Sequence, residues 1–320
     1  MRLFLFISLG LLLSVTAYSQ KRLIVAADGS GNYKTIQQAI NAVADSSKQV
    51  TVIYIKKGIY KEKLILPATK LNVKMIGEDK SNTIITYDDY HARKDSTGKE
   101  IGTSGSASFY IYGAGFSAEN LTIQNTAGLN AGQAVALWVA GDLAFFKNCR
   151  FLGFQDTLYT FGPGSRQLYV ACYIEGTVDF IFGAATAWFQ NCTIYCKKGG
   201  GFVTAASTPD SVKYGYVFKN CNITGDAPSQ SFYLGRPWRP YAKVVYINCD
   251  LGTQIIAQGW DFWRKESNKT TAYYAEYKNT GDGFKPDDRV NWSHQLTEAE
   301  ASLYTINNVL KGWNPNATIK

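Results

Sequence analysis

The sequence has little methionine and histidine, few charges and no Pro- or Ser-rich linker. Only 2 Met and 2 His occur in 320 residues, and charged residues make up 18% against 46% for hydrophobic ones. The low charge and high apolar content exclude a disordered chain, and the lack of a heptad or Gly-X-Y period excludes a coiled coil or a collagen. The chain has instead 29 Gly with 7 Trp, 21 Tyr and 17 Phe, which favours strands and turns.

Long apolar runs are also scarce, and the first 20 residues hold the one candidate for a membrane segment. Arg2 supplies a positive start, residues 3–13 form an apolar stretch of about 11 residues, and residues 17–19 read Ala-Tyr-Ser, a small-x-small cleavage site. Such a stretch is too short to span a bilayer comfortably. We therefore expect a signal peptide at residues 1–19, a mature domain at residues 20–320, and a secreted or periplasmic protein with no membrane attachment after cleavage.

The mature chain remains basic, because removal of the leader takes away a single basic residue from a formal charge of +8. A basic exported protein suits a polyanionic partner outside the cytoplasm. Net charge alone leaves acidic polysaccharide, nucleic acid and lipid open as that partner.

An internal repeat organises the middle of the chain. Six similar segments, each a short alternating strand beside a Cys or Leu, recur about 20 to 30 residues apart with turn-rich stretches between them. Repeats of this size predict an all-β fold, a parallel β-helix, in which successive coils stack about 4.8 Å apart and equivalent side chains form columns. The aligned positions are Leu121, Cys149, Cys172, Cys192, Cys221 and Cys249.

The two ends of the chain differ from the repeat. Residues 23–43 predict a strand, a glycine turn and a helix that could cap the N-terminal end of the β-helix. Near the other end, Thr297 and Glu300 form a capping box that predicts a short C-terminal helix over residues 298–309. Because no linker divides the chain, we expect a single domain.

Five of the six cysteines share the repeat position, and only Cys196 lies outside it. Cysteines of exported proteins usually form disulfides, whereas a column of inward-facing thiols can also be core packing. Neighbouring coils lie within the Cα reach of a disulfide. We predict that Cys192 is bridged, either to Cys172 or to Cys221. No CxxC pair and no His/Cys spacing indicates a zinc site.

Two aspartates repeat in one register. Asp156 and Asp179 each follow the cysteine of their own repeat by seven residues. Equal offsets place both carboxylates in one column on adjacent coils, with Cα atoms roughly 5 Å apart. The same offset falls on Gly128 and Gly199 in the flanking coils, which would leave the space beside the pair open. Two adjacent carboxylates cannot both ionise cheaply, so we expect one acid and one nucleophile or base.

The scarcity of histidine limits the chemistry of this pair. The two histidines are His91 and His294, and GTSGS at residues 102–106 does not match the G-x-S-x-G elbow of serine esterases. Without a histidine base, the carboxylates must supply the nucleophile and the acid/base themselves. For an acyl transfer, the neutral amides of Gln133 and Gln155 are suited as oxyanion donors.

Arg236, in LGRPW at residues 234–238, is the candidate cation for the pair. A guanidinium can grip a carboxylate through two parallel hydrogen bonds and hold it ionised. Because Arg236 lies about two coils beyond Asp179, a long loop or a strand end must bring it near.

Five ordered motifs resemble the pectin methylesterase family. They are GNYKTIQQAI (31–40), QAVAL (133–137), GFQDTLY (153–159), VDFIFG (178–183) and LGRPW (234–238), and GWDFW (259–263) is similar to a late element of that family. The resemblance covers about residues 22–313. It implies a right-handed parallel β-helix enzyme that removes methyl esters from the galacturonate units of pectin (methylated homogalacturonan). It also implies a monomer with no metal, no organic cofactor and no nucleic acid partner.

Carried over by motif, the resemblance gives these residues roles. Asp179 is similar to the nucleophile, and Asp156 to the acid that protonates the leaving methanol and then activates water. Gln133 and Gln155 match the oxyanion donors, and Arg236 matches the partner of the nucleophile. The candidate substrate-binding residues are Trp238, Tyr159, Phe182, Trp260 and Thr103. The segment 157–169 departs from the common pattern, which leaves the subsite preference open.

Two rival functions share parts of this pattern. A pectate lyase or polygalacturonase would share the fold and the substrate, but such lyases gather aspartates for calcium and such hydrolases carry NTD and GHG segments, which this sequence lacks. A non-catalytic binder of acidic polysaccharide would need the basic charge but not two Asp, two Gln and one Arg together. Methanol release from methylated pectin discriminates among them.

Overall fold

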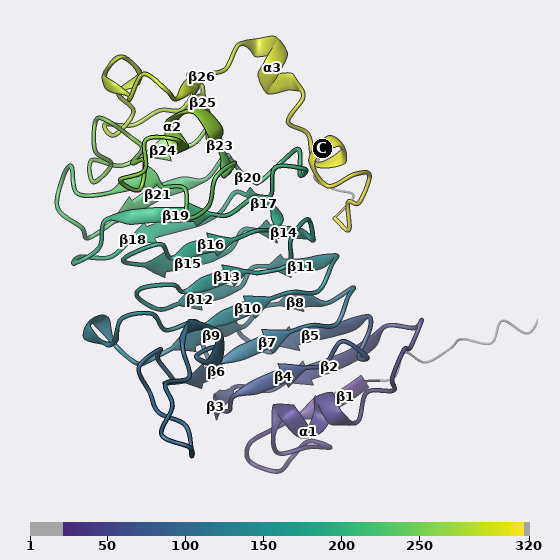
Figure 1. Ribbon diagram of the computed structural model, residues 1–320. Helices are drawn as coiled ribbons and strands as arrows, with labels where there is room; N and C mark the ends of the chain where they lie inside the picture. The colour runs from purple at the N-terminus through teal and green to yellow at the C-terminus, as the bar shows by residue number, and fades with distance from the viewer. Residues whose placement is uncertain (1–21, 317–320) are drawn as a thin grey trace, which may run out of the picture.

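The computed structural model describes residues 22–316, so the expected signal peptide lies outside the described residues. Parallel strands form three sheets that wind around one axis, and the coils stack from the N-terminal end to the C-terminal end (Figure 1). This architecture is the right-handed parallel β-helix that the sequence predicts. None of the helices in the described range is long and apolar enough to cross a membrane.

Seven coils, from β2–β4 to β20–β22, contribute one strand to each sheet, and the two ends of the β-helix add further strands to sheets A and B. Sheet A contains β1 (Arg22–Val25), β2 (Thr51–Ile55), β5 (Val73–Gly77), β8 (Ser117–Glu119), β11 (Ala144–Lys147), β14 (Arg166–Val170), β17 (Thr186–Gln190), β20 (Tyr216–Lys219), β23 (Lys243–Ile247), β25 (Tyr273–Tyr277) and β26 (His294–Gln295). Sheet B contains β3 (Gly58–Lys61), β6 (Thr83–Tyr87), β9 (Thr122–Asn125), β12 (Arg150–Leu152), β15 (Tyr173–Gly176), β18 (Thr193–Cys196), β21 (Asn222–Gly225) and β24 (Asp250–Leu251). Sheet C contains β4 (Leu64–Leu66), β7 (Phe109–Ile111), β10 (Leu137–Val139), β13 (Leu158–Thr160), β16 (Ile181–Gly183), β19 (Phe202–Ala206) and β22 (Tyr233–Gly235).

The aligned repeat positions stack at the turn between sheets A and B, as predicted. Leu121 and the five cysteines of the repeat are at most 2% exposed and belong to the core inside the coils. The residue before each of them has a left-handed backbone, with φ between 51° and 58°. Asparagine tolerates this conformation better than most residues, which explains the recurrent Asn-Cys pairs. These turn residues are Asn120, Asn148, Ala171, Asn191, Asn220 and Asn248.

The predicted disulfide at Cys192 is wrong, because all six cysteines are free thiols. The Cys192 thiol donates to the backbone carbonyls of Tyr169 and Gln190, each at 3.5 Å. The Cys192 amide donates to Cys221 Sγ at 3.4 Å. Backbone groups of neighbouring coils therefore contact the sulfur atoms, and the column is a packed stack of small side chains.

The N-terminal end is closed by helix α1 (Ile36–Asn41), as expected. Thr35 caps the helix, and its side chain and that of Gln38 form a capping box. The buried face of α1 contacts β1, β2 and β4 and so covers the end of the core. A helix in this place hides strand edges that would otherwise be open to pairing.

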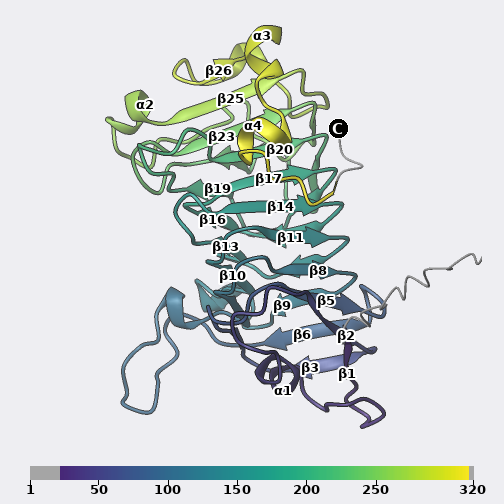
Figure 2. The same cartoon turned by 90° about the vertical axis from the view of Figure 1, so that its right-hand side faces the viewer.

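The C-terminal helix differs from the prediction, because two short helices replace the single one expected over residues 298–309. The capping box of Thr297 and Glu300 starts α3 (Glu298–Ser302). The chain then becomes extended at Thr305, whose side chain accepts from the Asn308 amide at 3.1 Å and starts α4 (Ile306–Val309). Helix α4 packs on the outer face of sheet A against β17 (Figure 2). A fourth helix, α2 (Asn268–Thr271), precedes β25.

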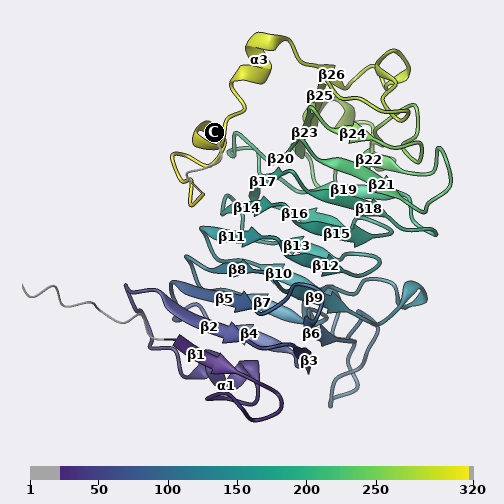
Figure 3. The same cartoon turned by 180° about the vertical axis from the view of Figure 1, so that it is seen from behind.

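The chain between β6 and β7, residues 88–108, leaves the coil and stands out from it (Figures 2 and 3). Its return leg contains a 3₁₀ turn at Thr103–Gly105. Lys63 anchors the excursion, because its ammonium contacts the carboxylate of Asp89 and the carbonyl of Gly105, both at 2.6 Å. The excursion thereby lies beside the outer face of sheet C.

Candidate active site

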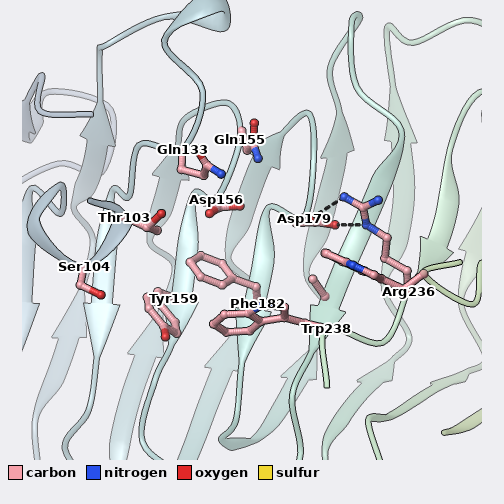
Figure 4. Close-up of a pocket in the computed structure, with 12 residues that line it drawn as sticks. Thr103, Ser104, Gln133, Gln155, Asp156, Tyr159, Asp179, Phe182, Arg236 and Trp238 are labelled. Atoms are coloured by element: carbon pink, nitrogen blue, oxygen red, sulfur yellow. Dashed lines mark hydrogen bonds and ion pairs between the residues drawn. The ribbon is translucent and has the colours of Figure 1, made fainter. Parts of the chain in front are cut away.

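A cleft of about 340 Å³ lies on the outer face of sheet C, and it gathers all but one of the predicted site residues (Figure 4). Its side chains come from five successive strands of sheet C or the turns beside them, from the excursion at residues 88–108 and from the segment after β24. The cleft is lined by Thr103, Ser104, Gln133, Gln155, Asp156, Tyr159, Asp179, Phe182, Ala205, Arg236, Trp238 and Trp263.

The two aspartates lie on adjacent coils in one register, as predicted. The Asp156 amide donates to the carbonyl of Val178 at 3.0 Å, and β13 pairs with β16 directly after the turn. Both residues are left-handed, with φ of 65° and 51°, and both are at most 7% exposed. Each carboxylate therefore leaves the coil at the same turn, immediately before a strand of sheet C.

The glycines expected beside this pair are not there. The in-register neighbours are Ala134 on one side and Phe202 on the other, since Gln133 bridges Gln155 and the Asp179 amide donates to the carbonyl of Phe202. In the flanking coils the offset from the repeat position to the position beside the pair is larger, thirteen residues from Leu121 to Ala134 and ten from Cys192 to Phe202. The seven-residue offset to Gly128 and Gly199 therefore does not carry over to them. The pair is consequently flanked by side chains rather than by open space.

A threonine and a glycine fix the shape of the turns that carry the two aspartates. The Thr157 hydroxyl contacts the carbonyl of Glu175 at 2.9 Å and so ties two coils together. A Cβ on Gly176 would lie 2.2 Å from the Cβ of Phe180 and 2.6 Å from the carbonyl oxygen of Phe154. No larger residue fits at Gly176, and the close approach of the two coils there fixes the position of the carboxylates.

Arg236 reaches Asp179 from the end of β22. Its Nε donates to Oδ1 at 2.9 Å and its terminal nitrogen to Oδ2 at 2.8 Å, a bidentate pair (Figure 4). The guanidinium lies between two rings, with its central carbon 3.7 Å from the ring centre of Phe202 and 3.9 Å from that of Trp263. Two cation–π contacts of this kind hold the planar group in the orientation that the carboxylate needs.

The electrostatic environment separates the two carboxyl groups. Burial raises the pKa of Asp156 well above its ordinary value, and the charge of Asp179 raises it further, while Arg236 opposes both effects. Burial also raises the pKa of Asp179, but there the hydrogen bonds and charge of Arg236 counteract it directly. Within residues 22–316, the Asp156 carboxyl has no hydrogen-bond or ion-pair partner. Asp156 is therefore the group better suited to hold a proton, and Asp179 the one better suited to remain ionised.

The two glutamines lie side by side above the carboxylates. Gln133 and Gln155 pair in register on adjacent coils, and Gln155 directly precedes Asp156. Their side-chain amides line the cleft and make no hydrogen bond to another part of the described chain (Figure 4). Two free amide donors are thus available to a group bound over the aspartates.

An aromatic wall forms the other side of the cleft. Tyr159 and Phe182 stack with ring centres 4.1 Å apart, and Trp238 meets their edges at 6.1 and 5.9 Å. Thr103, and with it Ser104, comes from the 3₁₀ turn of the excursion. These placements agree with the sequence-based assignment, which did not include Ser104.

Trp260, assigned to substrate binding from the sequence, lies elsewhere. It is 1% exposed and stacks on Tyr274 inside the core, with ring centres 4.4 Å apart. Its bridge to Gly235 places it in register with β22, facing inward. The chain then turns at Trp263 and Arg264, both with positive φ, and this turn brings Trp263 to the cleft. The GWDFW motif contained the correct residue, but only the turn decides between its two tryptophans.

No group of three or more His, Cys, Asp or Glu side chains gathers within the described range in a way that could hold a metal ion. The acidic side chains of the cleft are Asp156 and Asp179, and the second is engaged by Arg236. A metal-free reaction stays a prediction.

Comparisons with known proteins agree with this geometry. The family model described as Pectinesterase matches residues 22–313. Pectinesterase 31 of Arabidopsis thaliana is 40% identical over 287 residues, which cover 88% of this chain and 89% of that protein. A pectinesterase/pectinesterase inhibitor of Brassica campestris is 39% identical over 302 residues, covering 90% of this chain and 52% of its own length. The chain thus spans about half the length of relatives of this second kind.

Solved structures give the same result. Pectin methylesterase from carrot superposes with a TM-score of 0.84 and 37% identity, covering 93% of this chain and 96% of the carrot chain. A pectin methylesterase solved in complex with a hexasaccharide has a TM-score of 0.82 and 31% identity, covering 93% and 99%. Because both the family match and the relatives extend over nearly the whole described chain, the protein belongs to the pectinesterase family.

Proposed function

We propose that this protein is an exported esterase that hydrolyses the methyl esters of galacturonate units in pectin, with Asp179 as the nucleophile. The observation that carries the proposal is the asymmetric carboxylate pair. Asp179 is gripped by Arg236 at 2.9 and 2.8 Å, whereas its neighbour Asp156 is buried without a partner in the described chain. An ionised nucleophile beside a protonated acid is the arrangement that an ester substrate requires when no histidine is available.

In the first half of the reaction, an oxygen of Asp179 attacks the carbonyl carbon of the ester. The negative charge that develops on the carbonyl oxygen is stabilised by the amide donors of Gln133 and Gln155. When the tetrahedral intermediate collapses, the methoxy oxygen takes the proton of Asp156 and leaves as methanol. The products are an anhydride between Asp179 and the sugar carboxyl, and an ionised Asp156.

In the second half, water replaces methanol beside the ionised Asp156. The carboxylate accepts a proton from this water as its oxygen attacks the sugar carbonyl of the anhydride. The bond to Asp179 breaks, Asp179 returns to its ionised form with Arg236, and Asp156 is again protonated. The released galacturonic acid then ionises, so each cycle consumes one water and yields one methanol and one proton.

The aromatic wall and the excursion supply substrate contacts in this proposal. Trp238, Tyr159 and Phe182 offer flat apolar surfaces to the faces of the sugar rings, and Thr103 offers a hydroxyl from the opposite side. The basic charge of the chain attracts the anionic polymer. We propose that the protein acts as a monomer outside the cytoplasm, after cleavage of residues 1–19.

The test is to incubate the purified protein with highly methylated pectin and to follow three products. We expect methanol and acid in equal amounts, without new reducing ends and without unsaturated products that absorb in the ultraviolet. A chelator should leave the rate unchanged. Chain cleavage or a calcium requirement would contradict the esterase and support a hydrolase or a lyase.

A further inference from the structure

The aromatic column of sheet C continues beyond the cleft toward the N-terminal end. Tyr110, Trp138, Tyr159 and Phe182 pair in register on β7, β10, β13 and β16. The ring centres of Trp138 and Tyr159 are 4.3 Å apart, and those of Tyr110 and Trp138 are 5.8 Å apart. Tyr110 and Trp138 are buried and are not among the residues that line the cleft. Only the last two rings of the column are therefore explained by the proposed function.

Two exposed rings cover this continuation. Phe161 stacks on Trp138 with ring centres 4.6 Å apart and planes 29° apart. Tyr112 stacks on Tyr110 at 6.2 Å and 9°. Phe161 lies two residues beyond Tyr159, directly after β13, and Tyr112 lies two residues beyond Tyr110, directly after β7. Each ring therefore faces outward on the same side of sheet C. Phe161 is 39% exposed and Tyr112 is 40% exposed, so both present an open ring surface to solvent.

An open depression of the protein surface lies beside Phe161. It is formed by the loop at residues 161–165, together with Ala140 and Asp142. Asp142 is neutralised there by a bidentate contact with Arg166, at 3.1 and 2.6 Å. An anionic polymer lying over Phe161 would thus meet no unpaired carboxylate from Asp142.

We propose that Phe161 and Tyr112 form a second sugar-binding platform, which stacks on pyranose rings of the polymer beyond those held in the cleft. The inference rests on the proposed function, because it takes the occupant to be another part of the same galacturonan chain. The main argument for the platform is that the buried rings of the column connect it to the cleft without a gap. Phe161 lies directly beside the cleft, with its ring centre 5.5 Å from that of Tyr159. At about 4.8 Å per coil, Tyr112 on the coil of β7 lies roughly 14 Å from β16, a span that only an extended substrate could bridge.

The chemistry of the two rings fits this occupant. A sugar ring has an apolar face of C–H groups and hydroxyls at its edge, so it can lie on a flat aromatic surface while the hydroxyls remain in water. Trp138 and Tyr110 hold the exposed rings in place from below. The platform would therefore add affinity for long substrates and leave the reacting groups untouched.

The experiment measures methanol release by Phe161→Ala, Tyr112→Ala and the double variant on a methylated galacturonate dimer and on methylated polymer. For each single variant, we expect KM on the polymer to rise about fivefold, equivalent to ~1 kcal/mol, with kcat unchanged. On the dimer, Tyr112→Ala should equal the wild type in both parameters, because the dimer does not reach the coil of β7, and Phe161→Ala should lose less than it does on the polymer. Phe161→Tyr should restore the polymer KM, because it keeps the ring.

A matched control comes from the outer face of sheet B. Tyr173 and Tyr195 form a half-buried aromatic pair there, with ring centres 5.8 Å apart. Tyr195→Ala should change neither substrate's kinetics. An unchanged polymer KM in the platform variants, or an equal loss on dimer and polymer, would overturn the proposal.

A binding measurement separates this proposal from the proposed function. Titration of unesterified polygalacturonate into the wild type and into Phe161→Ala should give about fivefold weaker binding for the variant. A wild type that binds the polymer but releases no methanol would refute the esterase and leave the platform standing. Equal binding by both proteins would refute the platform, whatever the activity.

Discussion

Two columns of left-handed turn residues run along the molecule, and they differ in what the side chains do. At the turn between sheets A and B the column is mostly asparagine, and Asn148 donates its amide to Asn120 at 2.6 Å. At the turn into sheet C the corresponding pair is Asp156 and Asp179, two buried carboxyl groups. The backbone conformation is nearly the same in both columns. Neutral amides can satisfy one another along a stack, whereas stacked carboxylates raise each other's free energy unless one is protonated.

The aspartate pair lowers the stability of the fold at a position where the asparagine column does not. The asparagine column accepts hydrogen bonds from the side chains of Lys80 and Gln190. The buried aspartate pair instead depends on the bidentate guanidinium of Arg236 and on the two rings that hold it. The repeat thus provides equivalent turn positions, and the site differs from the others by its unfavourable electrostatics. Unusual electrostatics of this kind mark functional positions in many folds.

The largest effect is expected when the aspartate column is made to resemble the asparagine column. Asp179→Asn should lower kcat on methylated pectin by at least ~10⁴-fold, because an amide cannot form the acyl intermediate. The fold should survive, since the amide keeps the shape of the carboxylate, and circular dichroism should confirm this. Methanol release within a factor of ten of the wild type would remove Asp179 from the mechanism.

Asp156→Asn should reduce kcat by about 10²- to 10⁴-fold, the range of a lost general acid. Because water activation also depends on Asp156, an acyl-enzyme should accumulate and be visible as an added mass after acid quenching. The substitution should also raise the thermal midpoint near neutral pH. The folded-state pKa of Asp156 lies above its unfolded value, so wild-type stability is lost as pH rises between the two.

The gain in thermal midpoint from Asp156→Asn should therefore appear above the ordinary pKa of aspartate and vanish below it. Thermal melts of both proteins across acidic to neutral pH measure this. A constant difference at all pH values would contradict a raised pKa at Asp156.

A smaller effect is expected at the cation. Arg236→Lys should lower kcat/KM by about 10- to 100-fold, because a point charge cannot reproduce two parallel hydrogen bonds. Asp179 would lose part of the stabilisation of its ionised form, so its pKa should rise and the acid limb of the pH–rate profile should move to higher pH. Trp263→Ala should move the same limb in the same direction by less.

Arg166 offers the matched control for this prediction, since it grips Asp142 in the same bidentate manner away from the cleft. Arg166→Lys should leave the pH–rate profile unchanged. An Arg236→Lys profile that coincides with the wild type in both height and position would mean that the contact is structural only.

The smallest effect on activity is expected in the asparagine column. Asn191→Ala should lower the free energy of unfolding by about 1 kcal/mol, because alanine tolerates the left-handed backbone less well. Asn191→Gly should largely recover it. Methanol release should be unchanged in both, and denaturant titration measures the stability. A loss of activity in Asn191→Ala would contradict the prediction that the asparagine column contributes to stability and not to activity.

Features that depend on local spacing could be predicted from the sequence. The equal offsets of the repeat placed the two aspartates in one register. The apolar periodicity within residues 23–43 predicted helix α1, and the capping box at Thr297 begins a helix where expected. The contact of Arg236 with an aspartate followed from its motif and its chemistry.

Features that depend on loop length or side-chain direction could not be predicted. The glycines expected beside the aspartates lie elsewhere because the offset from the repeat position differs between neighbouring coils. Trp263 replaces Trp260 at the cleft because two positive φ angles reverse the direction of the chain between the coils. The thiol of Cys192 stays free, with backbone groups around its sulfur.

The sequence by itself determined the β-helix, the stacked turns and the two aspartates in one register, because repeat period and residue chemistry are local properties. Only the tertiary structure decided which rings hold Arg236, that the Asp156 carboxyl is buried without a partner in the described chain, and how far the aromatic column extends. These depend on burial and on contacts between coils distant in the chain, where an electrostatic shift or a stacked ring arises only once the coils have been packed together.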